Sequence, residues 1–171
     1  MWQYRGQSRP HFAEEPGVGQ ESVWDYPRPP RLAPDTRHIQ VRAGDRVLAD
    51  SRRTIRVLET ASPPTFYIPP EDVTIALLRP APGASVCEWK GAARYWALFE
   101  GPTAAAEIGW SYPNPTDGFA AIAGFFSFYP SRVLCTVNGE VVNAQPGGFY
   151  GGWVTGEIVG PFKGKPGTGH W

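Results

Sequence analysis

The sequence predicts a mostly β protein with a compact antiparallel fold. Of its 171 residues, 20 are glycine and 19 are proline. They recur too often for helices of typical length, because proline removes a backbone donor and glycine costs helix entropy. The 13% of aromatic residues distinguish the chain from a disordered one rich in proline and glycine. Short alternating runs of apolar and polar residues, separated by turn residues, indicate the strands.

The first twenty residues are set apart from the rest. Residues 1–20 are polar and show neither strand nor helix periodicity, so we expect a flexible, irregular arm. Residues 21–171 are predicted to form a single β-rich unit, long enough to bury roughly two-thirds of its unfolded surface. Within Ser22–Pro30 the prolines favour extended backbone, and Trp24 and Tyr26 are expected to anchor this stretch to the body.

Strands and hairpins follow from period-two alternation and from turn residues. Ile39–Ala49 alternates around Gly44-Asp45, and Val133–Val142 turns at Asn138-Gly139, a strong hairpin signal. Further strands are predicted at Thr54–Leu58, Thr65–Ile68, Tyr95–Phe99 and Phe125–Tyr129, the last one buried on both faces.

Other segments are less regular. Glu71–Leu78 could begin as a short helix after Pro70, but its alternating apolar residues favour a strand. Gly118–Ala123 is predicted to form a helical turn, whereas Thr103–Glu107 is too short for a stable helix. The glycine-rich tail from Gln145 carries spaced aromatic residues, which predicts a wrap over the surface of the body.

Charge and cysteine content exclude several classes of function. Sixteen basic and sixteen acidic residues balance without a run of like charge, so we expect neither nucleic acid nor a membrane as a partner. The longest apolar region, Ala120–Tyr129, is about half as long as a membrane span. With only Cys87 and Cys135 and no secretory signal, we expect a cytoplasmic protein with reduced thiols and without a metal or cofactor. The composition is compatible with a homo-oligomer as well as with a monomer.

The stretch Val86–Trp96 is the best candidate for a site. It combines a cysteine, a lysine and three large aromatic residues, a mixture that suits a small-molecule pocket better than a core strand. These rings and others could form a cage for a flat or cationic ligand, or they could simply be core residues. The candidate ligand-binding residues are Tyr67, Trp89, Lys90, Tyr95, Trp96, Trp110 and Tyr112.

Four short motifs recur in the same order along the chain. The recurring pairs begin at Trp24 and Trp110, Gly44 and Gly139, Phe66 and Phe149, and Trp89 and Phe162. We infer a tandem duplication, with two pseudo-repeated halves and a shortened second copy. The alternative is chance similarity within a chain rich in glycine, proline and aromatic residues. The last pair places Lys90 and Lys163 each between an aromatic residue and a glycine, but Cys87 has no counterpart.

Five motifs carry a family resemblance. They are Val47–Ser51, Tyr67–Val73, Cys87–Trp96, Trp110–Pro113 and Gly124–Tyr129. In this order they resemble the bacterial family known as domain of unknown function 427, over about residues 39–142, and residues 143–171 resemble an extension found on some members. The resemblance implies a small β fold with tent-like sheets and no established activity. It carries over no zinc site, because the chain lacks paired Cys-x-x-Cys motifs.

Cys87 and Lys90 carry the candidate chemistry. Cys87 could be a nucleophile whose thiolate Lys90 favours, or a small buried hydrophobe. Lys90, like Lys163, could bind an anion beside its glycine, or it could be a turn lysine whose stem covers a ring. We therefore predict a module that binds a small anionic or flat molecule in a pocket around Trp89–Trp96. The alternative is a cysteine-dependent enzyme that acts on a small metabolite through Cys87.

Overall fold

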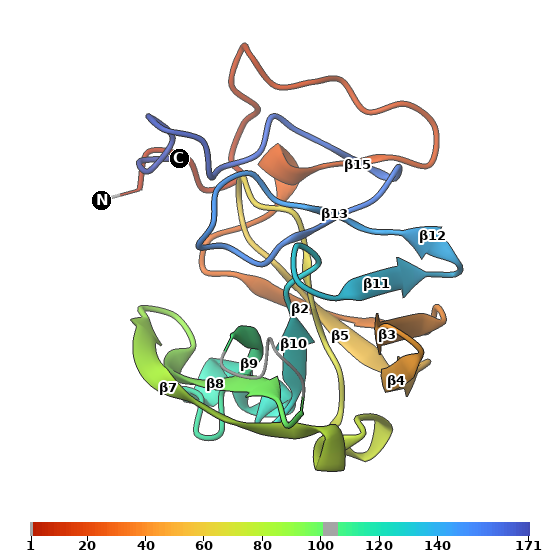
Figure 1. Cartoon of the computed structure of the whole chain (residues 1–171). Helices are drawn as coiled ribbons and strands as arrows, with labels where there is room; N and C mark the ends of the chain where they lie inside the picture. The colour runs from red at the N-terminus through yellow and green to blue at the C-terminus, as the bar shows by residue number, and fades with distance from the viewer. Residues whose placement is uncertain (1, 101–105) are drawn as a thin grey trace.

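The computed structural model describes residues 2–100 and 106–171 and confirms a mostly β fold (Figure 1). One antiparallel sheet has the strand order β12-β11-β3-β4, formed by Glu140–Val141, Leu134–Val137, Ile39–Ala43 and Arg46–Ser51. A second antiparallel sheet has the order β10-β9-β8-β7, formed by Phe126–Phe128, Glu107–Ser111, Gly91–Leu98 and Leu78–Cys87. A third has the order β2-β5-β6, formed by Arg31–Asp35, Thr54–Leu58 and Thr65–Tyr67.

Short elements complete the fold. The tail contributes β13 (Asn143–Ala144), β14 (Trp153–Val154) and β15 (Ile158–Val159), of which β15 pairs in parallel with β1 (Glu21–Ser22). Short 3₁₀ segments occur at Val23–Asp25, Pro70–Asp72, Ile75–Leu77 and Asp117–Ile122. The third sheet continues into the second, because Ile68 and Phe126 exchange two backbone hydrogen bonds of 2.7 and 2.9 Å.

The largest core cluster lies against the inner faces of these sheets. Alternation along β3 buries Ile39 and Val41, and the same alternation in β6 buries Phe66. The ring of Phe66 stacks on Trp153 at 4.8 Å between centroids, and the Trp153 indole N–H donates a 2.9 Å hydrogen bond to the Phe128 carbonyl. The tail therefore supplies a central core residue rather than only a surface cover.

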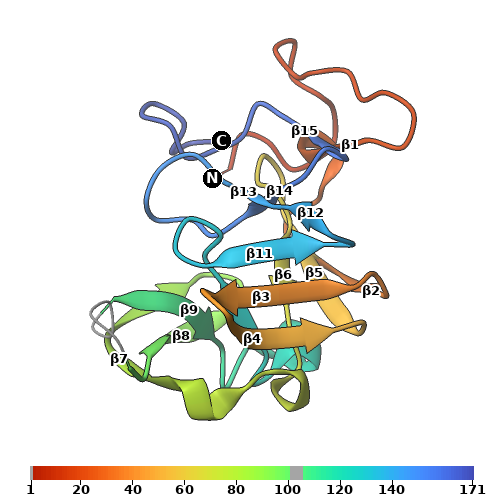
Figure 2. The ribbon, with the colours of Figure 1, turned by 45° about the vertical axis from the view of Figure 1, so that its right-hand side comes forward.

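The predicted hairpins and most predicted strands are confirmed. The turns at Gly44-Asp45 and Asn138-Gly139 join β3 to β4 and β11 to β12, and β3 pairs with β11. The two hairpins that share the proposed repeat thus lie side by side in one sheet (Figure 2). The helical turn predicted at Gly118–Ala123 is also present, displaced by one residue.

Two local predictions are wrong. Glu71–Leu78 is not a strand: Pro70–Asp72 and Ile75–Leu77 form 3₁₀ turns, and the strand begins only at Leu78. The prolines before this segment favour the start of a helical turn, and this preference outweighs the alternation of apolar residues. Val23–Asp25 is a 3₁₀ turn rather than extended chain, because the Ser22 hydroxyl accepts the Trp24 backbone N–H. The prediction for Thr103–Glu107 falls mostly outside the described residues.

The two ends of the chain lie together over the same part of the body (Figures 1 and 2). Residues 2–20 form no strand or helix, yet Tyr4 and Phe12 pack edge-on against buried Trp24. Phe12 also stacks on Trp171 at 5.2 Å. Aromatic contacts thus join the arm, the body and the tail, while the flexibility of the arm stays a prediction.

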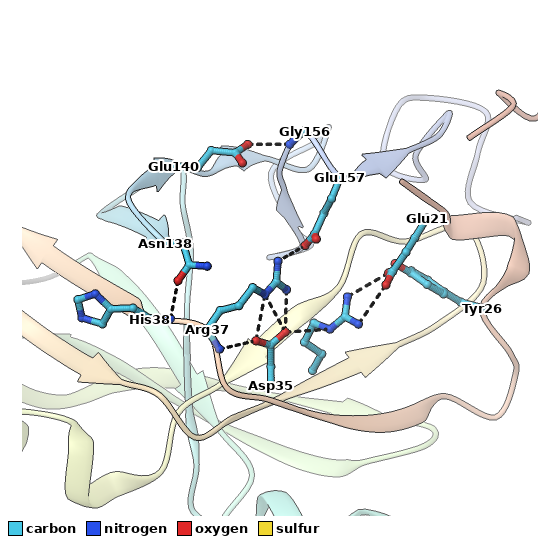
Figure 3. A network of polar contacts seen from close by, with 10 residues as sticks. Glu21, Tyr26, Asp35, Arg37, His38, Asn138, Glu140, Gly156 and Glu157 are labelled. Carbon is cyan, nitrogen blue, oxygen red and sulfur yellow. Dashed lines mark hydrogen bonds and ion pairs between the residues drawn. The ribbon is translucent and has the colours of Figure 1, made fainter. Parts of the chain in front are cut away.

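A polar network fastens the tail to the third sheet. Figure 3 shows Arg37 between Asp35 and Glu157, with which it forms ion pairs. Arg56 continues the network, with its Nη1 at 3.0 Å from Glu21 and its Nε at 3.4 Å from Asp35. All charged groups here have partners, so the network is structural. Among the described residues, no helix is long and apolar enough to cross a membrane.

Candidate functional site

A cavity of about 270 Å³ opens between the second sheet, the third sheet and the tail. Its walls are largely aromatic, and four charged side chains reach it, from Glu59, Glu88, Lys90 and Lys163. The aromatic lining residues are Trp2, Tyr67, Trp89, Tyr95, Trp110, Tyr112, Tyr129, Phe149 and Tyr150. Several of these rings also belong to a second core cluster. The same side chains therefore pack in the core and line the cavity.

Strand alternation directs three of the predicted rings into the cavity. Tyr95 on β8 lies directly opposite Trp110 on β9, and Tyr67 comes from the end of β6. The Trp110 indole N–H donates a 3.1 Å hydrogen bond to the Tyr67 hydroxyl. Burial raises the pKa of Tyr67, so this hydroxyl is neutral at physiological pH. The three rings are thereby held as one fixed wall.

Trp96 requires a correction, because it does not line the cavity. Successive residues of a strand face opposite sides of the sheet, so Tyr95 and Trp96 cannot share a face. Trp96 packs against the main core, 5.1 Å from the Phe126 ring, and donates a 2.9 Å hydrogen bond to Ser111. The Trp96 side chain therefore belongs to the main core and not to the cavity wall.

The turn between β7 and β8 presents Trp89 and Lys90 to the cavity. Thr116 holds this turn: its hydroxyl donates to the Trp89 carbonyl at 2.6 Å, and its backbone N–H donates to the Lys90 carbonyl at 3.2 Å. Gly91 has φ of +99°, a conformation that side chains disfavour. The glycine of the aromatic-Lys-Gly motif is therefore explained by the local backbone, because it lets the chain reverse direction directly after the lysine.

Lys90 is buried in this wall, with only 9% of the residue exposed. Its ammonium lies 5.6 Å from the centroid of Tyr112, and no carboxylate of a described residue is at ion-pair distance. Burial is the largest influence on the pKa of Lys90 and lowers it, but the neighbouring acidic groups of Tyr67, Cys87 and Glu59 together outweigh burial, so the pKa lies above its ordinary value. The side chain is therefore a buried cation without a carboxylate partner.

Cys87 also lines the cavity, at the end of β7 and beside Lys90. It is half-buried, whereas Cys135 is buried in the main core, where burial raises the pKa of its thiol. Both cysteines are unpaired. No histidine lines the cavity in the described part of the chain. Of the two cysteines, only Cys87 lines the cavity.

The other side of the cavity comes from residues that sequence reasoning did not select. Trp2 of the arm and Phe149, Tyr150 and Gly151 of the tail face the predicted wall. Lys163 completes this side. The aromatic-Lys-Gly motif that it shares with Lys90 was the sequence signal that could have identified it. The remaining residues lack such a signal, because only the three-dimensional path of the two chain ends brings them here.

The described residues contain no group of three or more histidine, cysteine or acidic side chains that could hold a metal ion. Comparison with known families gives a match over residues 31–139 to the family described as Domain of unknown function (DUF427). The chain belongs to this family. A comparison with curated proteins gives no significant match. The DUF427 region contains the predicted wall from Tyr67 to Tyr112, whereas Trp2 and the tail residues of the opposite wall lie outside it.

Proposed function

We propose that this DUF427 protein is a cytoplasmic module that binds a small, flat, anionic molecule in the aromatic cavity. The observation that carries the proposal is the buried Lys90 ammonium, which has no carboxylate partner among the described residues. An unpaired buried charge costs free energy, and an anion in the cavity would offset that cost. The pKa of Lys90 lies above its ordinary value, so the cation is present at neutral pH.

The aromatic lining supports a flat ligand. Rings such as Trp89, Tyr95 and Trp110 offer large apolar faces, and aromatic groups favour stacked or edge-on contacts with one another. The cavity of about 270 Å³ exceeds the roughly 150 Å³ that accommodates benzene in an apolar protein cavity. There is room for one substituted ring or a molecule of similar size.

Calorimetric titration with benzoate and benzamide tests the proposal, because the two probes differ mainly in charge. We expect benzoate to bind more tightly than benzamide. Lys90→Met keeps the stem of the side chain, removes the charge, and should weaken benzoate binding about tenfold or more. Lys165→Met is the matched control, since Lys165 is exposed and outside the cavity. Equal affinities for the two probes in the unmodified protein would refute an anion site.

The second candidate is a cysteine-dependent enzyme acting on a small metabolite. It is favoured by one observation, the position of Cys87 in the cavity wall beside the Lys90 ammonium. The thiolate form of a cysteine acts as the nucleophile in such enzymes. Iodoacetamide at neutral pH separates the candidates when the rates of Cys87 and free cysteine are compared. A rate well above that of free cysteine supports the enzyme, and a rate at or below it supports a binding module.

A further inference from the structure

Lys163 is a second buried cation of the same cavity. Only 4% of the residue is exposed, and its ammonium lies 4.3 Å from the Trp2 ring centroid and 5.4 Å from that of Tyr150. The ammonium donates a long 3.4 Å hydrogen bond to the main-chain oxygen of Trp171. As with Lys90, no aspartate or glutamate side chain of a described residue lies at ion-pair distance.

The tail holds Lys163 in a fixed position. Buried Gln145 donates a 2.8 Å hydrogen bond to the Lys163 carbonyl and accepts one of 3.1 Å from the Gly152 N–H. Gly164 lies against the backbone of Pro146 so closely that a Cβ would overlap it. The backbone around Lys163 is thus built into the cavity wall rather than exposed to solvent.

The charges around the cavity do not balance. Glu59 is a partly buried carboxylate of the lining, and buried Arg28 already pairs with it at 3.2 Å. Glu88 is exposed and accepts a 2.8 Å hydrogen bond from the Trp2 indole N–H. Lys90 and Lys163 are thus two buried cations of the cavity that form no ion pair with either of these carboxylates. Burial and the charge of Arg28 lower the pKa of Lys163 by more than Glu59 and Glu88 raise it.

The two lysines also serve different parts of the cavity. Lys90 lies over Tyr112 and comes from the β7–β8 turn, whereas Lys163 lies over Trp2 and Tyr150 and comes from the tail. We propose that the ligand carries two separate negatively charged groups on a flat apolar body, one group held by Lys90 and the other by Lys163. This inference rests on the proposed function and names its ligand class, with Lys163 as the residue that selects dianions over monoanions.

Calorimetric titrations of the full chain with terephthalate, benzoate and phenyl phosphate test this inference. Terephthalate has a carboxylate at each end of one ring, benzoate has one carboxylate, and phenyl phosphate concentrates its charge in one group. We expect terephthalate to bind about tenfold more tightly than benzoate, because it gains a second charge-assisted hydrogen bond. This comparison uses the unmodified protein and does not depend on the folding of a variant.

Variants of Lys163 test whether this residue holds the second negatively charged group of the ligand. Lys163→Met should reduce the advantage of terephthalate over benzoate from about tenfold to about twofold or less, since only Lys90 remains to hold a carboxylate. Lys163→Arg keeps the charge and should retain most of the advantage, and Lys165→Met should change neither affinity. Benzoate serves in each variant as the internal measure of an intact site.

The outcomes separate this inference from the proposed function. Binding of benzoate that depends on Lys90, without any gain for terephthalate, overturns the two-anion ligand and leaves the anion site standing. Phenyl phosphate as the tightest probe, weakened by loss of either lysine, also overturns it, because both cations would then meet one group. Failure of benzoate to bind better than benzamide overturns the proposed function itself.

Discussion

Gly151 lies directly against the ring of Trp110, so closely that a Cβ at residue 151 would overlap the indole. This contact joins the tail to the wall of the cavity that belongs to the DUF427 region. Residue 151 must therefore be glycine for the tail to close the cavity.

Gly151→Ala should push the tail away from Trp110. Overpacking of this kind costs about 1–3 kcal/mol of stability, measured as the free energy of unfolding in urea. Benzoate binding should weaken in parallel, because the tail side of the cavity moves. The control is Gly148→Ala, where a Cβ meets nothing within 4 Å. Equal stability of the two variants would show that the tail does not rest on Trp110.

Arg28 is expected to be the most costly charged residue to remove. Its guanidinium is buried and donates to Glu59, to the main-chain oxygens of Tyr4 and Thr60, and to that of Trp171 at 2.7 Å. Arg28→Met leaves these acceptors unpaired and should cost about 3 kcal/mol in the free energy of unfolding.

A surface arginine provides the comparison for Arg28. Arg9 pairs with Asp25 at 2.8 Å, but both side chains are substantially exposed. Arg9→Met should therefore cost at most about 1 kcal/mol. A loss of stability for Arg28→Met no larger than for Arg9→Met would contradict the structural role of Arg28.

Acid should weaken the network around Asp35. Burial alone raises the pKa of this carboxyl, but the hydrogen bonds from Arg37 outweigh it and hold the pKa below its ordinary value of 3.8. Since the folded state then binds the proton less readily, this stabilisation is present above pH 3.8 and is lost as the pH falls through the lower folded value.

The variant Asp35→Asn measures that pH dependence. It should be less stable than the unmodified protein at pH 7, and this difference in the free energy of unfolding should shrink as the pH falls below 3.8. Urea unfolding at each pH measures the difference. Asp45→Asn in the exposed β3–β4 turn is the control. A stability difference for Asp35→Asn that stays constant from pH 7 to pH 3 would be inconsistent with this titration.

Local patterns were sufficient for one wall of the cavity. Cys87, Trp89 and Lys90 share one hairpin, and Trp110 follows on the adjacent strand, so a single sequence stretch and period-two alternation bring them together. Trp96 was misplaced because residue type alone does not say which face of a strand meets the cavity. Assigning that face requires the register against neighbouring strands.

The opposite wall could not be predicted by the same reasoning. Trp2 reaches Glu88 across 86 positions of sequence, and the tail residues reach Trp110 only because glycines allow close backbone approach. Such contacts depend on the path of irregular chain, which neither alternation nor turn residues encode. The repeated aromatic-Lys-Gly motif is the exception, and the duplication that it suggests stays a hypothesis.

The tail is expected to be part of the folding unit rather than an accessory. Trp153 is fully buried in the main core, stacks on Phe66 and bonds to the Phe128 carbonyl. Trp153→Ala should therefore cost about 3–5 kcal/mol, as expected for a large aromatic residue removed from a core. Phe149→Ala removes a ring that is 68% exposed and should change stability by no more than about 0.5 kcal/mol.

If the chain is a single cooperative unit, the tail and the rest of the chain should unfold together. Urea unfolding followed by fluorescence and by circular dichroism should give one coincident transition, shifted as a whole in Trp153→Ala. Limited proteolysis of the unmodified protein should remove at most residues 1–20. Release of a stable fragment that begins near Glu107, or a separate early transition of the tail, would mean that the DUF427 region folds without its extension. In that case the tail side of the cavity would be a detachable cover, and Lys163 could not be a fixed part of the site.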